Sequence, residues 1–198
     1  MIKAVIFDLF GTLTNGKCNP EEEIIKTFNL KPDISDVEKL VCGTYFKNWD
    51  SYLDIIIKIL DLPDTNKTKG ILLDIFKNDF AKEEINSEMI NQIKILKSEG
   101  IKLGLLSNIP NPLYDIIRKN NLEDYFDEIL YSFNECLIKP DLNFFNLILF
   151  QLNVKPSEVI MVGNSLRSDI EPAKKLGLNT IHFKDVIQLK KELVSFFV

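Results

Sequence analysis

The chain has 198 residues, of which 45% are hydrophobic and 27% are charged, and its formal net charge at pH 7 is −5. This length suffices for one well-buried core, or for a core domain that carries a smaller insertion. The mildly acidic charge argues against a dedicated nucleic-acid-binding protein, because such a protein needs a concentrated basic surface. No apolar run approaches the roughly 20 residues of a membrane-spanning helix. The first run, at residues 2–7, stops at Asp8 and is too short for a signal peptide.

The three cysteines are widely spaced, and no two of them form a CxxC pair: they are Cys18, Cys42 and Cys136. This pattern favours reduced thiols over a disulfide or a zinc site. We therefore expect a cytoplasmic protein whose partner is a small molecule rather than a membrane or a nucleic acid. No apolar stripe in the sequence predicts an oligomeric state.

The first predicted element is a strand at residues 2–7, an apolar run (IKAVIF) that ends at Asp8. Residues 15–84 then contain helical patterns and no convincing strand. The helical segments lie at residues 21–28, 36–41, 49–60 and 69–80, and the turn-like residues 61–69 are expected to join the last two. An all-helical block between the first strand and the rest of the chain predicts an inserted subdomain.

After residue 84, strands and helices alternate. Short apolar runs predict strands at residues 101–106, 128–131 (a weaker run), 159–162 and 180–183. Runs that are apolar without alternation indicate strands buried on both faces, as in a parallel sheet. Helical patterns lie at residues 87–98, 141–152 and 166–176. The predicted fold class is therefore α/β, with a Rossmann-like parallel sheet built from residues 1–14 and 85–198 and a helical insertion at residues 15–84.

Polar side chains follow the predicted strands at the points where those strands end. Asp8 follows the first strand, Ser107 and Asn108 follow the second, Lys139 precedes the helix after the weaker run, and Asp169 lies shortly after the next strand. In parallel α/β sheets, ligands bind outside the carboxyl ends of the strands. The sequence therefore predicts that two carboxylates, a hydroxyl, an amide and an amine meet at one edge of the sheet.

The segments that carry these residues resemble the four motifs of the haloacid dehalogenase (HAD) superfamily of hydrolases. They read DLFGTLT from residue 8, LLSN from residue 105, IKPDLNFF from residue 138 and VGNSLRSDIEPAKKLGL from residue 162, and they occur in the family's order. Four such matches, each at a predicted strand end, are far more specific than any one alone. The resemblance implies a HAD-like core and, because residues 15–84 lie between the first two motifs, a helical cap over the active site.

The resemblance also implies roles for the residues at the sheet edge. Asp8 is expected to be the nucleophile that forms a covalent aspartyl intermediate. Lys139 is expected to keep Asp8 ionised and to attract an anion, since a unit charge about 4 Å away contributes on the order of 4 kcal/mol at a partly exposed site. Asp169 is expected to be the second catalytic carboxylate at the sheet edge. Three side chains are expected to hold anionic oxygens of the substrate: Thr12, Ser107 and Asn108. For Thr12 and Ser107, ordinary loop hydrogen bonding is the alternative role.

Two residues depart from the pattern of the family's phosphatases. Those enzymes have a second Asp at position 10 that protonates the leaving group, whereas this chain has Phe10. Loss of a positioned general acid costs about 10²- to 10⁴-fold in rate, so substrates with good leaving groups, such as aryl or acyl phosphates, are expected to suffer least. The second departure is Asn164, which stands where a carboxylate normally binds Mg²⁺. The expected Mg²⁺ ligands are Asp8, the backbone carbonyl of Phe10, and Asn164 or Asp169, and this set is expected to bind the ion less tightly.

The favoured function is a HAD-like hydrolase that acts on a small phosphorylated metabolite. The alternative is a catalytically weakened relative that serves as a ligand-binding or interaction protein. A 2-haloacid dehalogenase is less expected, because residues 1–117 contain no arginine to hold the halide and Leu166 replaces an Asn of that branch. Lys17 and Lys47 are candidates for contact with an anionic substrate. The aromatic cluster at residues 45–52 is expected to be helix-packing core rather than a substrate wall.

Overall fold

The computed structural model describes residues 1–16, 20–30, 42–114 and 121–197. The expected helix at residues 36–41 lies outside these ranges, as do Lys17 and Cys18. Cys42 is buried, and Cys136 is an exposed free thiol. Within the described ranges, no helix combines the length and the apolar character that crossing a membrane requires.

Five parallel strands form the central sheet, in the order β3-β2-β1-β4-β5. They are β1 (Ala4–Phe7), β2 (Lys102–Ser107), β3 (Glu128–Tyr131), β4 (Val159–Gly163) and β5 (Asn179–His182). All five predicted strands are confirmed with boundaries that differ by no more than two residues, and the predicted α/β fold class is confirmed. The first strand lies in the middle, with Phe7 between Leu105 of β2 and Val162 of β4.

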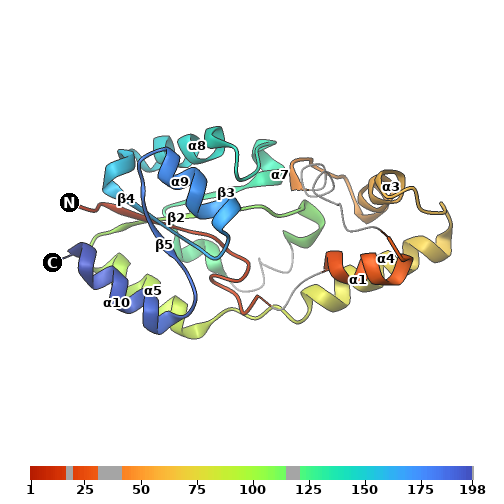
Figure 1. Ribbon diagram of the computed structural model, residues 1–198, viewed down its shortest axis with the longest axis horizontal. Helices are drawn as coiled ribbons and strands as arrows, with labels where there is room; N and C mark the ends of the chain where they lie inside the picture. Colours follow the sequence, from red (N-terminus) through yellow and green to blue (C-terminus); the bar gives the residue numbers. More distant parts are fainter. Residues whose placement is uncertain (17–19, 31–41, 115–120, 198) are drawn as a thin grey trace.

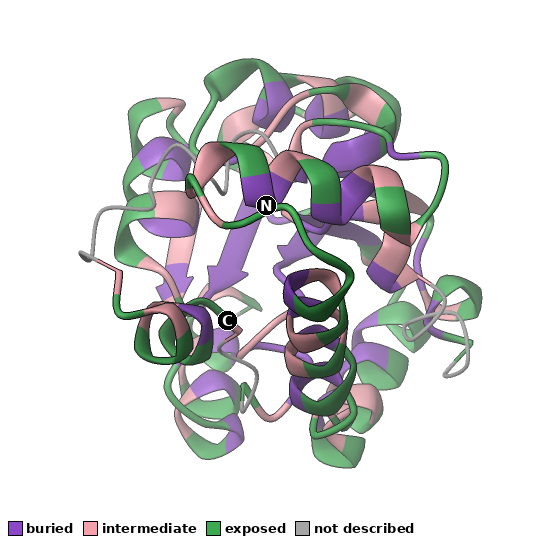
Figure 2. Cartoon of the chain, turned by 90° about the vertical axis from the view of Figure 1, so that its right-hand side faces the viewer, coloured by how far each residue is buried: buried purple, intermediate pink, exposed green. Residues whose placement is uncertain are grey.

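Helices cover both faces of the sheet, which explains the unbroken apolar runs (Figures 1 and 2). Val5 and Phe7 pack with residues of α5 (Ser87–Ser98) and α10 (Val186–Phe197). Ala4 and Ile6 pack on the other face with residues of α8 (Leu142–Leu152) and α9 (Glu171–Lys175). The sheet is thereby held rigidly, and the loops at its carboxyl edge carry the polar residues. Short elements lie between these helices and strands: η1 (Asn111–Leu113), η2 (Leu122–Tyr125), α7 (Ser132–Glu135), η3 (Pro156–Glu158) and η4 (Leu166–Ile170).

Two helices near the carboxyl end differ from the sequence predictions. The helix expected at residues 166–176 is interrupted: residues Leu166–Ile170 form a π-helical turn, η4, and the α-helix α9 follows. Pro172 contributes to this break, because it lacks the N–H that a continuous helix would use. Helix α10 was not predicted at all, although its buried residues Val186, Leu189 and Leu193 have helical spacing.

Among the described residues, three helices form a separate group at one end of the molecule (right in Figure 1): α1 (Pro20–Phe28), α3 (Trp49–Ile59) and α4 (Asn66–Phe80). Their core is aromatic, with Tyr52 in edge contact with Phe46, Trp49 and Phe76 at centroid distances of 5.2–5.7 Å. The turn between α3 and α4 is shorter than the residues 61–69 that the sequence predicted. Helix α4 begins at Asn66, because the Thr65 side chain caps it by accepting from the Thr68 N–H.

The two chain segments that connect this helical group to the sheet run side by side. Thr14 and Ile85 form an isolated antiparallel bridge, the N–H of Asn15 donates to the Glu84 carbonyl at 3.0 Å, and the N–H of Asn86 donates to the Leu13 carbonyl at 2.9 Å. This crossing coincides with the predicted boundaries after residues 14 and 84. The division into a core and a cap stays a prediction.

Candidate active site

Asp8 is the first residue after β1, and its carboxylate is almost completely buried, with 7% of the residue exposed. Its N–H continues the sheet ladder by donating to the Val162 carbonyl at 2.9 Å. The loop that follows turns back on itself, with Gly11 at a φ of +75°, which only glycine adopts freely. This turn brings the Thr12 hydroxyl to Asp8, where it donates to Oδ2 at 3.1 Å.

Lys139 lies between two carboxylates. Its Nζ is 2.5 Å from Asp8 Oδ1 and 2.7 Å from Asp169 Oδ1, and 2% of the residue is exposed. The Asn108 amide holds the Lys139 backbone from both sides, accepting from its N–H at 2.8 Å and donating to its carbonyl at 2.9 Å. Asn108 therefore positions Lys139 in this structure, a use that was not anticipated from the sequence.

Asp169 lies on the π-helical turn, and its second oxygen, Oδ2, accepts from the Ser165 N–H at 3.0 Å. The carboxylate fits because residue 163 has no side chain: a Cβ at Gly163 would lie 2.4 Å from the Asp169 carboxyl. The close approach of backbone and carboxylate explains why glycine stands at the end of β4.

These three charged groups control one another's protonation. Burial raises the pKa of Asp8 from 3.8 to about 6; Lys139 opposes this increase and the negative charge of Asp169 adds to it. Burial alone would lower the pKa of Lys139, but the Asp8 and Asp169 carboxylates outweigh it and the pKa is raised. At neutral pH Asp8 is therefore ionised and Lys139 is protonated.

Ser107 is the last residue of β2 and is completely buried. Its hydroxyl has no hydrogen-bond partner among the described residues. A buried hydroxyl without a partner costs about 1–3 kcal/mol. The Ser107 hydroxyl thus has an unmet hydrogen bond at the carboxyl end of β2.

The two departures from the family pattern, Phe10 and Asn164, have different surroundings. The Phe10 ring makes an edge contact with Phe80 of α4 at a centroid distance of 5.5 Å, so it joins the sheet edge to the helical group. The Asn164 side chain is exposed, and its amide lies so close to the first loop that a Cβ at Gly11 would be 2.1 Å from its Nδ2. The His182 ring contacts the Asn164 carbonyl through Nε2 at 3.0 Å.

The donor atoms expected for Mg²⁺ fit a hard cation in type. The Asp8 carboxylate and the Phe10 carbonyl belong to one loop, and the missing side chain at Gly11 gives the Asn164 amide room beside that loop. Within the described residues, no group of three or more His, Cys, Asp or Glu side chains has metal-binding geometry. These oxygen ligands thus carry less negative charge than the sites that usually bind a cation such as Mg²⁺.

Two further side chains join the sheet edge to the helical group, and the sequence did not predict either. Asn111 accepts from the Phe46 N–H at 2.7 Å and donates to the Phe46 carbonyl at 2.5 Å. The Ser132 hydroxyl donates to the Cys42 carbonyl at 2.7 Å and accepts from the Ile109 N–H at 2.9 Å. Their partners are 65 and 90 residues away in the chain, so no local pattern could have indicated them.

The sequence matches the haloacid dehalogenase-like hydrolase family over residues 2–177. The chain belongs to this family. Among curated HAD-type relatives, the glyceraldehyde 3-phosphate phosphatase of Pyrococcus abyssi is 28% identical over 199 residues, covering 93% of this chain and 82% of that protein. The phosphorylated carbohydrates phosphatase of Thermotoga maritima is 26% identical over 194 residues, covering 91% of this chain and 84% of that protein.

Solved HAD structures share the fold. A HAD-family enzyme of Bacteroides thetaiotaomicron, solved in complex with magnesium and inorganic phosphate, matches with a TM-score of 0.69 at 19% identity, covering 96% of this chain and 99% of that chain. A HAD-like hydrolase of Porphyromonas gingivalis matches with a TM-score of 0.69 at 20% identity, covering 98% of each chain.

Proposed function

We propose that this HAD-family protein is a phosphatase that hydrolyses small phosphate esters through an aspartyl intermediate at Asp8. The observation that carries the proposal is the buried group of Asp8, Lys139 and Asp169, together with the Ser107 hydroxyl at the same sheet edge, which has no hydrogen-bond partner within the described part of the chain. The names of the curated relatives, which describe phosphatases of phosphorylated carbohydrates and of glyceraldehyde 3-phosphate, support the same reaction.

In the proposed reaction, the ionised Asp8 carboxylate attacks the phosphorus atom. The bond between phosphorus and the ester oxygen breaks, and its electron pair leaves with that oxygen. Water then attacks the aspartyl phosphate, which releases inorganic phosphate and restores the carboxylate. Lys139 offsets the charge on Asp8 and on the incoming phosphoryl group, while Asp169 holds the ammonium in place. The Ser107 hydroxyl is proposed to bind a phosphoryl oxygen. Thr12 and Asn108 are proposed to do the same by exchanging the hydrogen bonds that they donate to Asp8 and to the Lys139 carbonyl for bonds to the substrate.

Mg²⁺ is the proposed cofactor, held by Asp8, the Phe10 carbonyl, and Asn164 or Asp169. When bound there, the ion would polarise a phosphoryl oxygen and neutralise charge. The Bacteroides thetaiotaomicron enzyme, which was solved with magnesium and inorganic phosphate, supports this assignment. We expect weak binding, because Asn164 contributes no charge.

Residues 15–84 are proposed to be a cap over the site. The paired connections at Thr14 and Ile85 provide a place about which it can move, and Phe80, Phe46 and Cys42 contact the core. Such a cap excludes water during the reaction. A cap of this size suits small substrates.

A second candidate function follows from Phe10. Its side chain cannot protonate a leaving group, and its ring is engaged with Phe80. The second candidate is therefore a weakened HAD relative that binds a small phosphate compound without turnover.

The test is hydrolysis of an aryl phosphate with and without Mg²⁺, using the wild-type chain beside Asp8→Asn. Asp79→Asn is the matched control, because Asp79 is also buried and paired with a lysine, Lys82, but lies on α4. We expect turnover in wild type and Asp79→Asn and at least a 10³-fold loss in Asp8→Asn, consistent with removal of a nucleophile. Equal rates in wild type and Asp8→Asn would rule out the phosphatase and leave the binding protein.

A further inference from the structure

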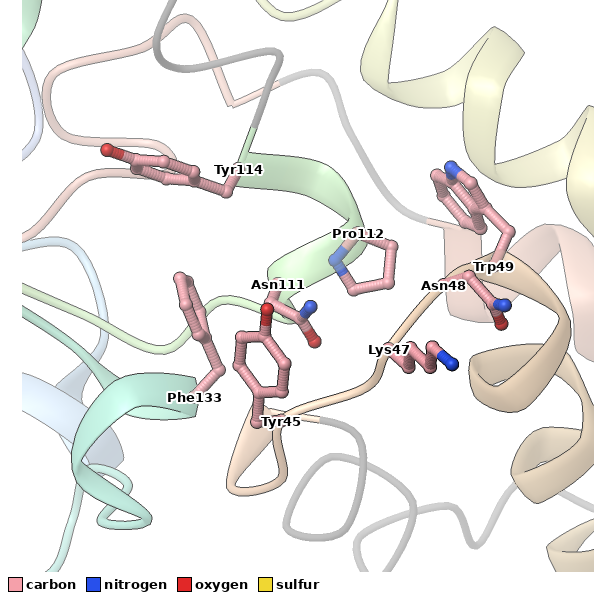
Figure 3. A pocket seen from close by; sticks show the side chains of 8 residues that line it. All are labelled: Tyr45, Lys47, Asn48, Trp49, Asn111, Pro112, Tyr114 and Phe133. Atoms are coloured by element: carbon pink, nitrogen blue, oxygen red, sulfur yellow. The ribbon is translucent and has the colours of Figure 1, made fainter.

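A pocket of about 280 Å³ lies between the helical group and the core (Figure 3). Four aromatic side chains line it. Tyr45 precedes α3, Trp49 is the first residue of α3, and Tyr114 and Phe133 belong to the core. We call this the aromatic pocket. Its volume is close to the lower limit of small-molecule sites, roughly 300 Å³, which is suited to a single ring.

Most of the polar side chains in this lining are already engaged within the protein. The Asn111 amide binds the Phe46 backbone, the Asn48 side chain caps α3 by accepting from the Ser51 N–H, and the Tyr114 hydroxyl donates to Glu123. Lys47 carries the one positive charge in the lining, and its exposed ammonium has no ion-pair partner among the described residues. The pocket therefore offers aromatic faces and one available cation.

The aromatic pocket lies on the same edge of the sheet as Asp8. Asn111 begins η1 shortly after β2 ends at Ser107, and Phe133 lies just beyond the end of β3. β2 is the neighbour of β1 and β3 is the neighbour of β2, so these walls follow the two strands next to β1 on one side of the sheet. In Figure 3, Tyr45 and Phe133 lie on one side of the pocket, and Lys47 and Trp49 lie on the other.

We propose that the aromatic pocket receives the leaving group, and that the substrates are phosphate esters of phenols whose ring carries a second negative charge. This inference rests on the proposed phosphatase function and names its substrate class. Two independent observations lead to the same class. Aromatic walls favour a planar ring, with each aromatic pair contributing about 0.5–1.5 kcal/mol beyond burial. Phe10 provides no general acid, and a phenolate leaves without one.

The reaction balances with such a substrate. When Asp8 attacks phosphorus, the phosphorus–oxygen bond to the ring breaks, and the oxygen leaves as a phenolate with the electron pair. The aromatic ring disperses that charge, and the phenolate takes its proton from water after release. Lys47 would pair with the carboxylate or other anionic group on the ring, not with the phosphoryl group.

Trp49 is the only tryptophan of the chain, so its fluorescence reports on the aromatic pocket directly. The full-length protein is titrated with three phosphonates that cannot be hydrolysed: phenylphosphonate, 4-carboxyphenylphosphonate and methylphosphonate. We expect saturable changes in Trp49 emission with the two aryl probes and none with methylphosphonate. The carboxylated probe should bind about 2- to 5-fold more tightly than phenylphosphonate, the range for an exposed ion pair.

Two variants and two matched controls identify the contacts. Lys47→Met should abolish the preference for the carboxylated probe, whereas Lys77→Met, an exposed lysine of α4, should leave it unchanged. Tyr45→Ala should weaken both aryl probes about 2- to 10-fold, whereas Phe150→Ala, an exposed aromatic on α8, should not. Equal responses to methylphosphonate and phenylphosphonate, or a preference that survives Lys47→Met, would overturn the proposal.

Hydrolysis assays separate this inference from the proposed function. If aryl and alkyl phosphates are hydrolysed with the same kcat/KM and Trp49 does not respond, the phosphatase stands and the substrate class is wrong. If Trp49 responds as expected but no phosphate ester is hydrolysed, the pocket binds aryl anions and the phosphatase is wrong, so the substrate-class proposal fails with it.

Discussion

At the scale of single residues, the protonation of Asp8 sets the pH range in which the site can work. Its pKa is raised to about 6, mainly by burial, and only the ionised carboxylate can attack phosphorus. Because the folded-state pKa lies above the ordinary value of 3.8, ionising Asp8 disfavours the folded state, and this residue alone reduces stability as the pH rises from about 3.8 to 6.

We therefore expect the Asp8 carboxyl carbon to titrate near pH 6 in NMR spectra of the metal-free protein, with the signal assigned by its loss in Asp8→Asn. Lys139→Met should move this midpoint upwards, because the ammonium favours the charged form. Lys102→Met, which removes a lysine bound to the Leu152 carbonyl instead, is the control. A midpoint near 4 in the wild type would contradict the expected effect of burial.

The residue at position 10 provides a second test at this scale. Phe10→Asp restores the general acid of the family's phosphatases, so hydrolysis of alkyl phosphates should rise about 10²-fold or more. The loss of the Phe10–Phe80 contact also occurs in Phe10→Asn, which cannot supply a proton and should show no gain. If Phe10→Asp gains nothing over Phe10→Asn, the wild-type site is a binding site and not a weakened catalyst.

The polar group at the sheet edge was predictable because each member follows a strand. Asp8 and Ser107 lie at strand ends that parallel pairing brings to one edge, and Asp169 lies on the turn that follows β4, so their approach follows from the topology. The use of Asn108 to hold the Lys139 backbone was not predictable, since an amide near an anion site fits substrate binding equally well.

At the scale of elements, the sheet was easier to predict than the helices. Strands buried on both faces are unbroken apolar runs, whereas the limits of α4 and of α9 depend on caps and single prolines. The π-helical turn at Leu166–Ile170 carries Asp169. No pattern in its sequence distinguishes it from an α-helix.

Helix α5 offers a test of how a capped helix end contributes to the stability of the fold. The Asn86 side chain caps it by accepting from the N–H groups of Glu88 and Met89 at 3.0 and 3.3 Å. Asn86→Ala should reduce the free energy of unfolding by about 1 kcal/mol, and Asn86→Asp, which retains a capping oxygen, should stay close to wild type. Urea denaturation of the three proteins measures this difference, and an equal loss in both variants would show that the cap is not its source.

At the scale of the whole molecule, Asn111 makes two of the hydrogen bonds that join the helical group to the core within the described part of the chain. Its amide binds both the N–H and the carbonyl of Phe46, like one step of a sheet ladder, and so fixes Tyr45 and Lys47 beside the core. Asn111→Ala removes both bonds without changing the sheet. Asn111→Asp keeps an acceptor for the Phe46 N–H but loses the donor to its carbonyl.

We expect hydrogen exchange at the Phe46 amide to accelerate strongly in Asn111→Ala and less in Asn111→Asp, with exchange in β1 and α5 unchanged. The aryl probes should bind less tightly in the same order, because the aromatic pocket needs both of its halves held together. Uniform acceleration in β1 and α5 would mean that Asn111 stabilises the entire fold. Faster exchange at Phe46 with unchanged probe affinity would mean that the aromatic pocket binds the aryl probes without the hydrogen bonds between Asn111 and Phe46. Only local loosening together with weaker binding would agree with a cap that is held over the site by the loop after β2.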